Sequence, residues 1–204
     1  FTQESEMKRQ FDVNVYGPIR VIQAALPIMR KQDMYPVQGV FRTSEERGRI
    51  VFISSMAAIF SIPFQSMYSA SKAAINAYTD ALRNEVRPYG ISCCCVLPGD
   101  IRTGFTDARK KSIEGDAEYG GRISRSVAVM EKDERGGMSP DVAGAYIAKI
   151  ALKKKVKPLY AIGFQYKAFC VIMKLLPIGF SNKLFINKLI VLVIKSLELY
   201  ISNL

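Results

Sequence analysis

The sequence predicts an α/β fold in which a parallel sheet is flanked by helices. Two apolar runs, Arg49–Ile53 and Ile91–Leu97, have the length of buried strands. Between them, apolar residues recur at close to a 3.6-residue period from Met67 to Val86, which indicates a helix. A strand, a helix and a second strand joined by tight connections form a right-handed crossover in a parallel sheet. We expect a partial sheet of about three strands, with five or more helices.

The segment Glu4–Lys31 is expected to form a helix ahead of the first strand, because an apolar stripe runs along it. Pro18 interrupts this helix, and the amide that proline lacks would have bonded the carbonyl four residues earlier. That carbonyl belongs to Asn14. The sequence therefore predicts an Asn14 main-chain carbonyl without its helical partner.

Local signals define the remaining elements. Arg87–Gly90 should end the helix, since proline and glycine both stop helices. Ser139, followed by proline and aspartate, predicts the start of another helix. Lys157–Ile162 is expected to be the last strand. The polar segment Asp33–Gly48 is longer than a helix-to-strand connection requires, and we interpret it as a surface insertion.

Tyr68 and Lys72 can move a proton in a chain that has no histidine. They are four residues apart, so a helix places both on one face. A close cation favours the phenolate and lowers a tyrosine pKa from its ordinary value near ~10. Ser55 follows the first strand, and ligands of parallel sheets bind beyond the carboxyl ends of strands. A tyrosine and a lysine at this spacing are weak evidence of a catalytic site when they occur alone. The full set of polar residues, each on its expected element, is much stronger evidence.

These residues resemble the catalytic part of the short-chain dehydrogenase/reductase family, which uses NAD or NADP on a Rossmann-type domain. The resemblance covers nearly all of residues 4–165. It is carried by the order and spacing of Asn14, Ser55, Tyr68, Lys72, Pro98, Gly99 and Thr103.

The resemblance implies a role for each residue. Tyr68 would be the general acid/base, while Lys72 would lower the tyrosine pKa and hold the nicotinamide ribose. Ser55 would orient the substrate carbonyl or alcohol. The Asn14 carbonyl would hold a water that relays protons toward Lys72. The nicotinamide end of the cofactor would meet Pro98, Gly99, Ile101 and Thr103.

Only the second half of the family's domain resembles this chain. Nothing in the sequence matches the glycine-rich turn that cradles the cofactor pyrophosphate. The residue that chooses between NAD and NADP should follow the family's second strand, which belongs to the half that this chain does not resemble. We therefore expect a fragment that is inactive, folds poorly or self-associates alone. By the resemblance, the intact protein is a homo-oligomer, and residues 104–137 contain a lid over the substrate. A solvated surface loop is the alternative interpretation of this segment.

Residues 166–204 are predicted to form a basic, hydrophobic helical extension beyond the catalytic domain of residues 1–165. Residues 149–204 carry +9 of the chain's net charge of +11. Lysines interrupt the apolar runs, so no stretch of about 18 apolar residues could span a bilayer. Lysine-edged helices suit peripheral membrane contact, but the tail could equally dock on a partner subunit or cap the substrate site. Nucleic acid is not expected as a partner, because aromatic stacking residues do not alternate with the lysines.

Cys93, Cys94 and Cys95 are expected to be buried thiols rather than metal ligands, because adjacent cysteines lack metal-ligand spacing. Cys170 is a distant single cysteine, so we assign no metal and no disulfide. Free thiols suit a reducing compartment, and we expect a cytoplasmic protein that can associate with membranes.

Two classes of function follow from the sequence. The first is an oxidoreductase that interconverts a secondary alcohol and a ketone, with a lipid-like or steroid-like substrate as a hypothesis. The second is a truncated binding or scaffold protein that keeps the site residues without catalysis. The coding sequence upstream of Phe1 would discriminate them: an in-frame glycine-rich strand, turn and helix favours the enzyme.

Overall fold

The computed structural model describes residues 2–33, 46–108, 114–177 and 179. Within these ranges, three strands form one parallel sheet in the order β1 (Gly48–Ile53), β2 (Ile91–Leu97) and β3 (Leu159–Ala161). Ile50 of β1 pairs with Cys93 of β2, and Cys95 pairs with Leu159 of β3. This topology confirms the predicted α/β fold with a partial parallel sheet.

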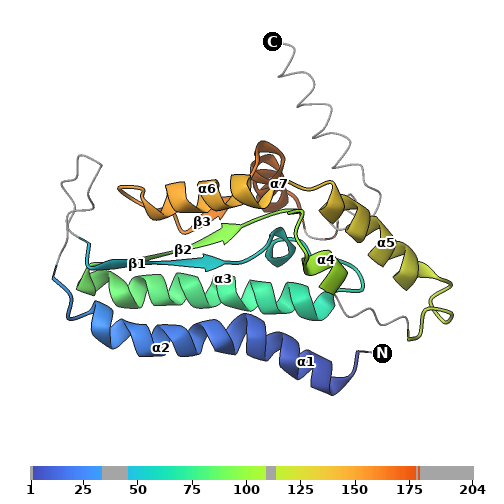
Figure 1. The fold of residues 1–204 in the computed structure, drawn as a ribbon, viewed down its shortest axis with the longest axis horizontal. Helices are drawn as coiled ribbons and strands as arrows, with labels where there is room; N and C mark the ends of the chain where they lie inside the picture. Colours follow the sequence, from blue (N-terminus) through green and yellow to red (C-terminus); the bar gives the residue numbers. More distant parts are fainter. Residues whose placement is uncertain (1, 34–45, 109–113, 178, 180–204) are drawn as a thin grey trace, which may run out of the picture.

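Helices cover both faces of the sheet (Figure 1). Helix α3 (Ser66–Val86) lies on the face where Phe52, Cys93 and Cys95 are buried. Helix α6 (Pro140–Ala151) lies on the opposite face, where its residue Ile150 packs with Cys94 and Val96. Because side chains alternate along a strand, the three adjacent cysteines divide between two hydrophobic clusters.

The N-terminal segment forms an outer layer against α3 (Figure 1). It consists of α1 (Glu4–Phe11), the π-helical turn η1 (Asp12–Tyr16) and α2 (Gly17–Met29). The Gly17 amide donates to the Asp12 carbonyl five residues earlier, so the helix widens just before Pro18. A widened turn accommodates the proline ring and its missing donor. The predicted helix is present, with its interruption spread over η1.

Short elements join the helices and strands. The 3₁₀ turn η2 (Met56–Ala58) follows β1, and η3 (Arg87–Tyr89) follows α3. Gly90 then reverses the chain with φ of 70°, as the predicted stop requires. The Ser139 hydroxyl accepts a 3.3 Å bond from the Val142 amide, which is the predicted N-cap of α6. Helices α4 (Phe105–Ala108) and α5 (Arg122–Arg135) lie between β2 and α6.

Helix α7 (Phe164–Leu175) packs against the core that α3 covers. Phe169 is buried, and its ring meets Phe60 edge-to-face with centroids 4.8 Å apart. The start of the predicted C-terminal extension is therefore helical and joins the core. Most of that extension (residues 178 and 180–204) and most of the predicted insertion (residues 34–45) lie outside the described residues.

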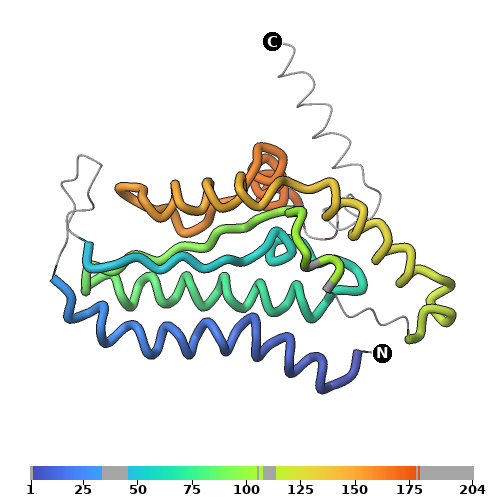
Figure 2. Tube along the Cα trace, viewed as in Figure 1, coloured from blue at the N-terminus to red at the C-terminus, as the bar shows by residue number. Residues whose placement is uncertain are grey.

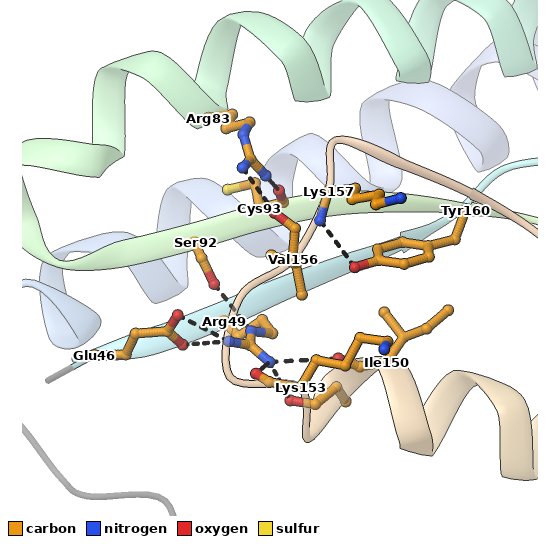
Figure 3. A network of polar contacts seen from close by, with 11 residues as sticks. Glu46, Arg49, Arg83, Ser92, Cys93, Ile150, Lys153, Val156, Lys157 and Tyr160 are labelled. Atoms are coloured by element: carbon orange, nitrogen blue, oxygen red, sulfur yellow. Dashed lines mark hydrogen bonds and ion pairs between the residues drawn. The ribbon is translucent and has the colours of Figure 1, made fainter. Parts of the chain in front are cut away.

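Arg49 joins β1 to the end of α6 (Figure 3). Its Nη1 donates to the carbonyl oxygens of Ala151 at 2.7 Å and Lys153 at 2.5 Å, and its Nε donates to the Ser92 hydroxyl at 2.9 Å. The other arm of the guanidinium contacts both carboxylate oxygens of Glu46, at 2.8 and 2.7 Å. Only 8% of the Arg49 side chain is exposed. The guanidinium thus satisfies carbonyls that a helix end leaves without partners.

Candidate active site

Tyr68 and Lys72 lie together at the carboxyl end of β1. Both are half-buried on α3, and the Lys72 Nζ is 5.8 Å from the centroid of the Tyr68 ring. The same nitrogen donates a 3.1 Å bond to the carbonyl oxygen of Ile53, the last residue of β1. A phenol and an amine therefore share the end of the sheet at which ligands of parallel sheets bind.

Burial changes the proton affinity of Lys72. Desolvation lowers the pKa of its ammonium, because burial disfavours the charged form, and the nearby Cys95 thiol acts in the opposite direction. An amine has three donors when protonated, and the Ile53 carbonyl accepts from one of them. The remaining donors suit hydroxyl groups of a bound ligand.

Ser55 lies two residues beyond β1, at the start of η2. Its backbone is extended, and its hydroxyl accepts a 3.1 Å bond from the Ala57 amide. The neighbouring Ser54 is buried, and its hydroxyl donates 3.2 Å to the Lys72 carbonyl. These bonds attach the end of β1 to α3, so Ser55 is held close to the part of α3 that carries Lys72.

Asn14 reaches the same helix from η1. Its Nδ2 donates a 3.0 Å bond to the Ser71 hydroxyl, and that hydroxyl donates 2.7 Å to the Tyr68 carbonyl. Ser71 is fully buried, with no exposed surface. The Asn14 side chain is thus linked through Ser71 to the turn of α3 that carries Tyr68.

The segment after β2 holds the residues expected to meet the nicotinamide. Pro98 is buried, and its carbonyl accepts a 3.0 Å bond from the Met56 amide, which places it beside Ser55. Gly99 follows, while Ile101 forms a parallel bridge with Met138 and Thr103 is exposed. Pro98 and Ser55 are thus brought together, whereas Thr103 is exposed.

After β2 ends at Leu97, the chain passes through Ile101 and later returns to the same point at Met138. The Arg102 amide donates to the Met138 carbonyl, and the Met138 amide donates to the Asp100 carbonyl, both at 3.0 Å. Between these ends the chain carries α4 and α5, which project beyond the sheet (Figure 2). We call the segment between these ends the α4–α5 excursion, and we call its hydrogen-bonded ends the neck.

Aromatic contacts connect the α4–α5 excursion to the loop before α3. The ring of Phe64 meets that of Tyr119 edge-to-face at 5.6 Å, and the Arg122 guanidinium lies 5.8 Å from the Phe64 centroid. Phe64 adopts a φ of 62°, which non-glycine residues rarely do. The excursion therefore contacts the segment just before Tyr68.

Sequence reasoning missed three residues around the site: Ser71, Asp100 and Tyr166. Ser71 had a weak signal, since it is one helical turn from Tyr68. Asp100 directly follows Gly99, but aspartate after glycine is common in turns. Tyr166 is distant in sequence, and its contact with Asp100 depends on how α7 packs. The described residues contain no group of three or more metal-ligating side chains.

Comparison with known proteins identifies the class that this geometry suggests. Residues 1–114 match the family model described as short chain dehydrogenase. The chain therefore belongs to the short-chain dehydrogenase/reductase family.

Among curated proteins, the chain is similar to a 3-ketodihydrosphingosine reductase of Bacteroides thetaiotaomicron, with 40% identity over 169 residues. That match covers 79% of this chain and 58% of the relative. A second relative is the probable short-chain type dehydrogenase/reductase VdlC of Helicobacter pylori, at 27% identity over 90% of this chain and 64% of the relative. The chain thus spans less than two thirds of the length of these relatives.

Solved structures share the fold. A short-chain dehydrogenase from Streptomyces avermitilis aligns with a TM-score of 0.62 and 28% identity, covering 83% of this chain and 57% of that one. A short-chain dehydrogenase from Burkholderia cenocepacia, solved with NADP, aligns with a TM-score of 0.55 and 17% identity. It covers 83% of this chain and 54% of the Burkholderia chain. These likenesses confirm the Rossmann-like architecture.

Proposed function

We propose that the intact protein is an NAD(P)-dependent oxidoreductase that interconverts a secondary alcohol and a ketone. The observation that carries this proposal is the position of Lys72, whose amine contacts both the end of β1 and the ring of Tyr68. Family membership and the names of the relatives support it.

In this proposal Tyr68 is the general acid/base. In the reductive direction the phenol gives its proton to the carbonyl oxygen, while a hydride reaches the carbonyl carbon; oxidation reverses both transfers. The nicotinamide, when bound, supplies or accepts that hydride. Ser55 would hold the substrate oxygen by a hydrogen bond. Lys72 would stabilise the phenolate and bind ribose hydroxyls, while the Asn14 carbonyl would hold a relay water.

The cofactor is NAD or NADP, with Pro98, Gly99, Ile101 and Thr103 at its nicotinamide end. The N–H donors of Lys72 and the serine hydroxyls that follow β1 suit hydrogen bonds to the ribose hydroxyls of such a dinucleotide. The described residues contain no glycine-rich turn suited to the pyrophosphate. We therefore assign activity to the intact protein and expect the isolated 204-residue chain to be inactive.

The substrate is proposed to be a lipid-like ketone or alcohol. Phe64, in the loop before α3, contacts Tyr119 of the α4–α5 excursion, and these partly exposed aromatic rings near Tyr68 suit an apolar substrate. The name of the Bacteroides relative, a 3-ketodihydrosphingosine reductase, is consistent with a long-chain ketone.

The test is Tyr68→Phe in the intact protein, with Tyr78→Phe as a matched control on the same helix. Tyr78 is partly buried and packs edge-to-face on the core residue Phe52, with ring centroids 5.9 Å apart. We expect Tyr68→Phe to reduce turnover by ~10²-fold or more, as for loss of a general acid, while dinucleotide affinity changes little. Near-normal turnover in Tyr68→Phe would exclude Tyr68 as the acid/base.

A homo-oligomer is also proposed, paired through the outer surface of η1 and α2. Val13, Val21 and Ile28 are 63–65% exposed there, which is unusual for large apolar side chains in one layer. Val21→Glu should lower the mass measured by light scattering, and an unchanged mass would count against this surface.

Peripheral membrane contact is proposed through residues 166–204. On α7, Val171 and Leu175 are 58% and 77% exposed, and Lys167 and Lys174 lie on the neighbouring side of the helix. No helix among the described residues is long and apolar enough to cross a bilayer. Flotation with anionic but not neutral vesicles, reduced by Leu175→Ser, is the expected result; equal flotation with both kinds would contradict it.

A further inference from the structure

Tyr166, at the start of α7, forms two hydrogen bonds with one residue next to the candidate active site. Its hydroxyl accepts a 3.2 Å bond from the Asp100 amide and donates a 2.9 Å bond to the Asp100 Oδ2. Both groups are half-buried. The phenol therefore fixes the backbone and the side chain of Asp100 together.

The ring of Tyr166 also lies against Gly99. A Cβ atom added to Gly99 would be 1.9 Å from the Tyr166 Cζ, so no side chain fits at this position. From the other side, the Met56 amide donates to the Pro98 carbonyl. The turn Pro98–Asp100 is thus held between η2, which follows Ser55, and α7.

Burial keeps Tyr166 in the form that this contact needs. It raises the pKa of Tyr166 to about 12, so the phenol is protonated and able to donate at neutral pH. Burial also raises the pKa of Asp100, and Asp133 and Glu134 on α5 act in the same direction. The hydrogen bond from Tyr166 opposes this increase and favours the Asp100 carboxylate.

We propose that Tyr166 is a positioning residue for the cofactor: its ring and hydroxyl hold the Pro98–Asp100 turn in the shape that receives the nicotinamide. This inference rests on the proposed function, because it assigns the turn to the cofactor. It gives α7 a role in dinucleotide binding, although α7 lies outside the residues matched by the family model.

The experiment compares Tyr166→Phe with Tyr160→Phe in the intact protein. The control removes the phenol hydroxyl of a residue on β3, which accepts a 2.8 Å bond from the Lys157 amide rather than from Asp100. Hydrogen exchange of a peptide covering residues 97–104 is measured without cofactor. The Kd for NADH and NADPH is measured by nicotinamide fluorescence, and KM for the dinucleotide and kcat are measured separately.

We expect Tyr166→Phe to speed exchange in this peptide and to raise Kd and KM about tenfold, the effect of ~1.4 kcal/mol, with kcat within about threefold. Tyr160→Phe should change none of these values by more than about twofold. Asp100→Ala removes the carboxylate from the other side of the same contact. It should also speed exchange and raise Kd, even if Tyr166→Phe folds poorly.

Unchanged exchange in both Tyr166→Phe and Asp100→Ala would overturn the proposal, as would faster exchange with unchanged Kd. A wild-type protein that binds neither dinucleotide would instead overturn the proposed function. It would also remove the cofactor role of Tyr166, while the exchange measurement would still decide whether Tyr166 holds the turn.

Discussion

The side chain of Asn14 donates to the hydroxyl of Ser71, with 3.0 Å between Nδ2 and Oγ. Ser71 is fully buried and itself donates to the Tyr68 carbonyl, so the bond links the π-helical turn to the helix that carries the candidate acid/base. A buried hydroxyl that loses its partner costs more free energy than the bond contributes.

We therefore expect Asn14 and Ser71 to be energetically coupled. In a double-mutant cycle of Asn14→Ala and Ser71→Ala, the coupling free energy should be about 1 kcal/mol, the size of one hydrogen bond. Urea unfolding of the four proteins measures it. Additive effects of the two substitutions would show that the contact contributes nothing to stability.

Gly99→Ala should destabilise the protein because the new methyl group would overlap the Tyr166 ring. We expect a loss of about 1–3 kcal/mol, as for other overpacked sites. In a Tyr166→Ala background the same change should cost much less, since the ring is gone.

The control for this steric prediction is Gly144→Ala in α6, where an added Cβ has no heavy atom within 4 Å. Alanine is the better helix former, so this change should stabilise the protein by about 0.5–1 kcal/mol. Equal costs of Gly99→Ala in the two Tyr166 backgrounds would contradict the steric explanation.

Arg49→Met should be strongly destabilising, because it leaves Glu46 and the carbonyls at the end of α6 without their cation. We expect a loss of about 3 kcal/mol in the free energy of unfolding, the lower end for breaking a buried pair. Glu46→Gln keeps a hydrogen-bond acceptor and should cost less. Lys8→Ala breaks a pair with Glu4 whose side chains are 76–77% exposed, and it should change stability by less than about 1 kcal/mol. A similar cost for the Arg49 and Lys8 substitutions would contradict this account.

Stability should decrease as pH rises above 9. Burial raises the pKa of Cys93 to about 12 and that of Cys95 to about 11, from an ordinary value of 9.0. Above pH 9 the thiols ionise in the unfolded chain but stay protonated in the folded one, so the unfolded state gains stability. Each thiol can contribute a slope of up to about 1.4 kcal/mol per pH unit until its folded pKa is reached.

Urea unfolding between pH 8 and 10 checks this prediction. Cys93→Ala should give a smaller decrease than wild type over this range, because one of the three buried thiols is gone. The opposite sign, with stability rising between pH 9 and 10 in wild type, would be incompatible with thiols that stay protonated in the folded state.

The sequence predicted the elements that depend on local patterns. The period of the apolar residues defined α3 to within one residue, and the four-residue spacing placed Tyr68 and Lys72 on one face. The two long strands and the N-cap at Ser139 were predicted for the same reason. The role assigned to each site residue remains a prediction.

The contacts that sequence could not predict join distant segments. Arg49 binds main-chain carbonyls at the end of α6. Every residue has such a carbonyl, so the residue types in the sequence do not indicate which ones Arg49 binds. Tyr166 meets Gly99 and Asp100 only because α7 folds back onto the core. The widened turn before Pro18 depends on how the helix redistributes its bonds around one missing donor.

The neck at Ile101 and Met138 has a consequence for how the residues between its two ends can be exchanged. The main chain around Ile101 is hydrogen-bonded to Met138, so the segment between these two residues begins and ends at one fixed place. Gly137 lies at this place, since a Cβ there would be 2.5 Å from the Asp100 carbonyl group. We therefore expect that a segment of another length or composition can be grafted between these ends while the strands keep their pairing, because connecting segments tolerate insertions better than the elements they join.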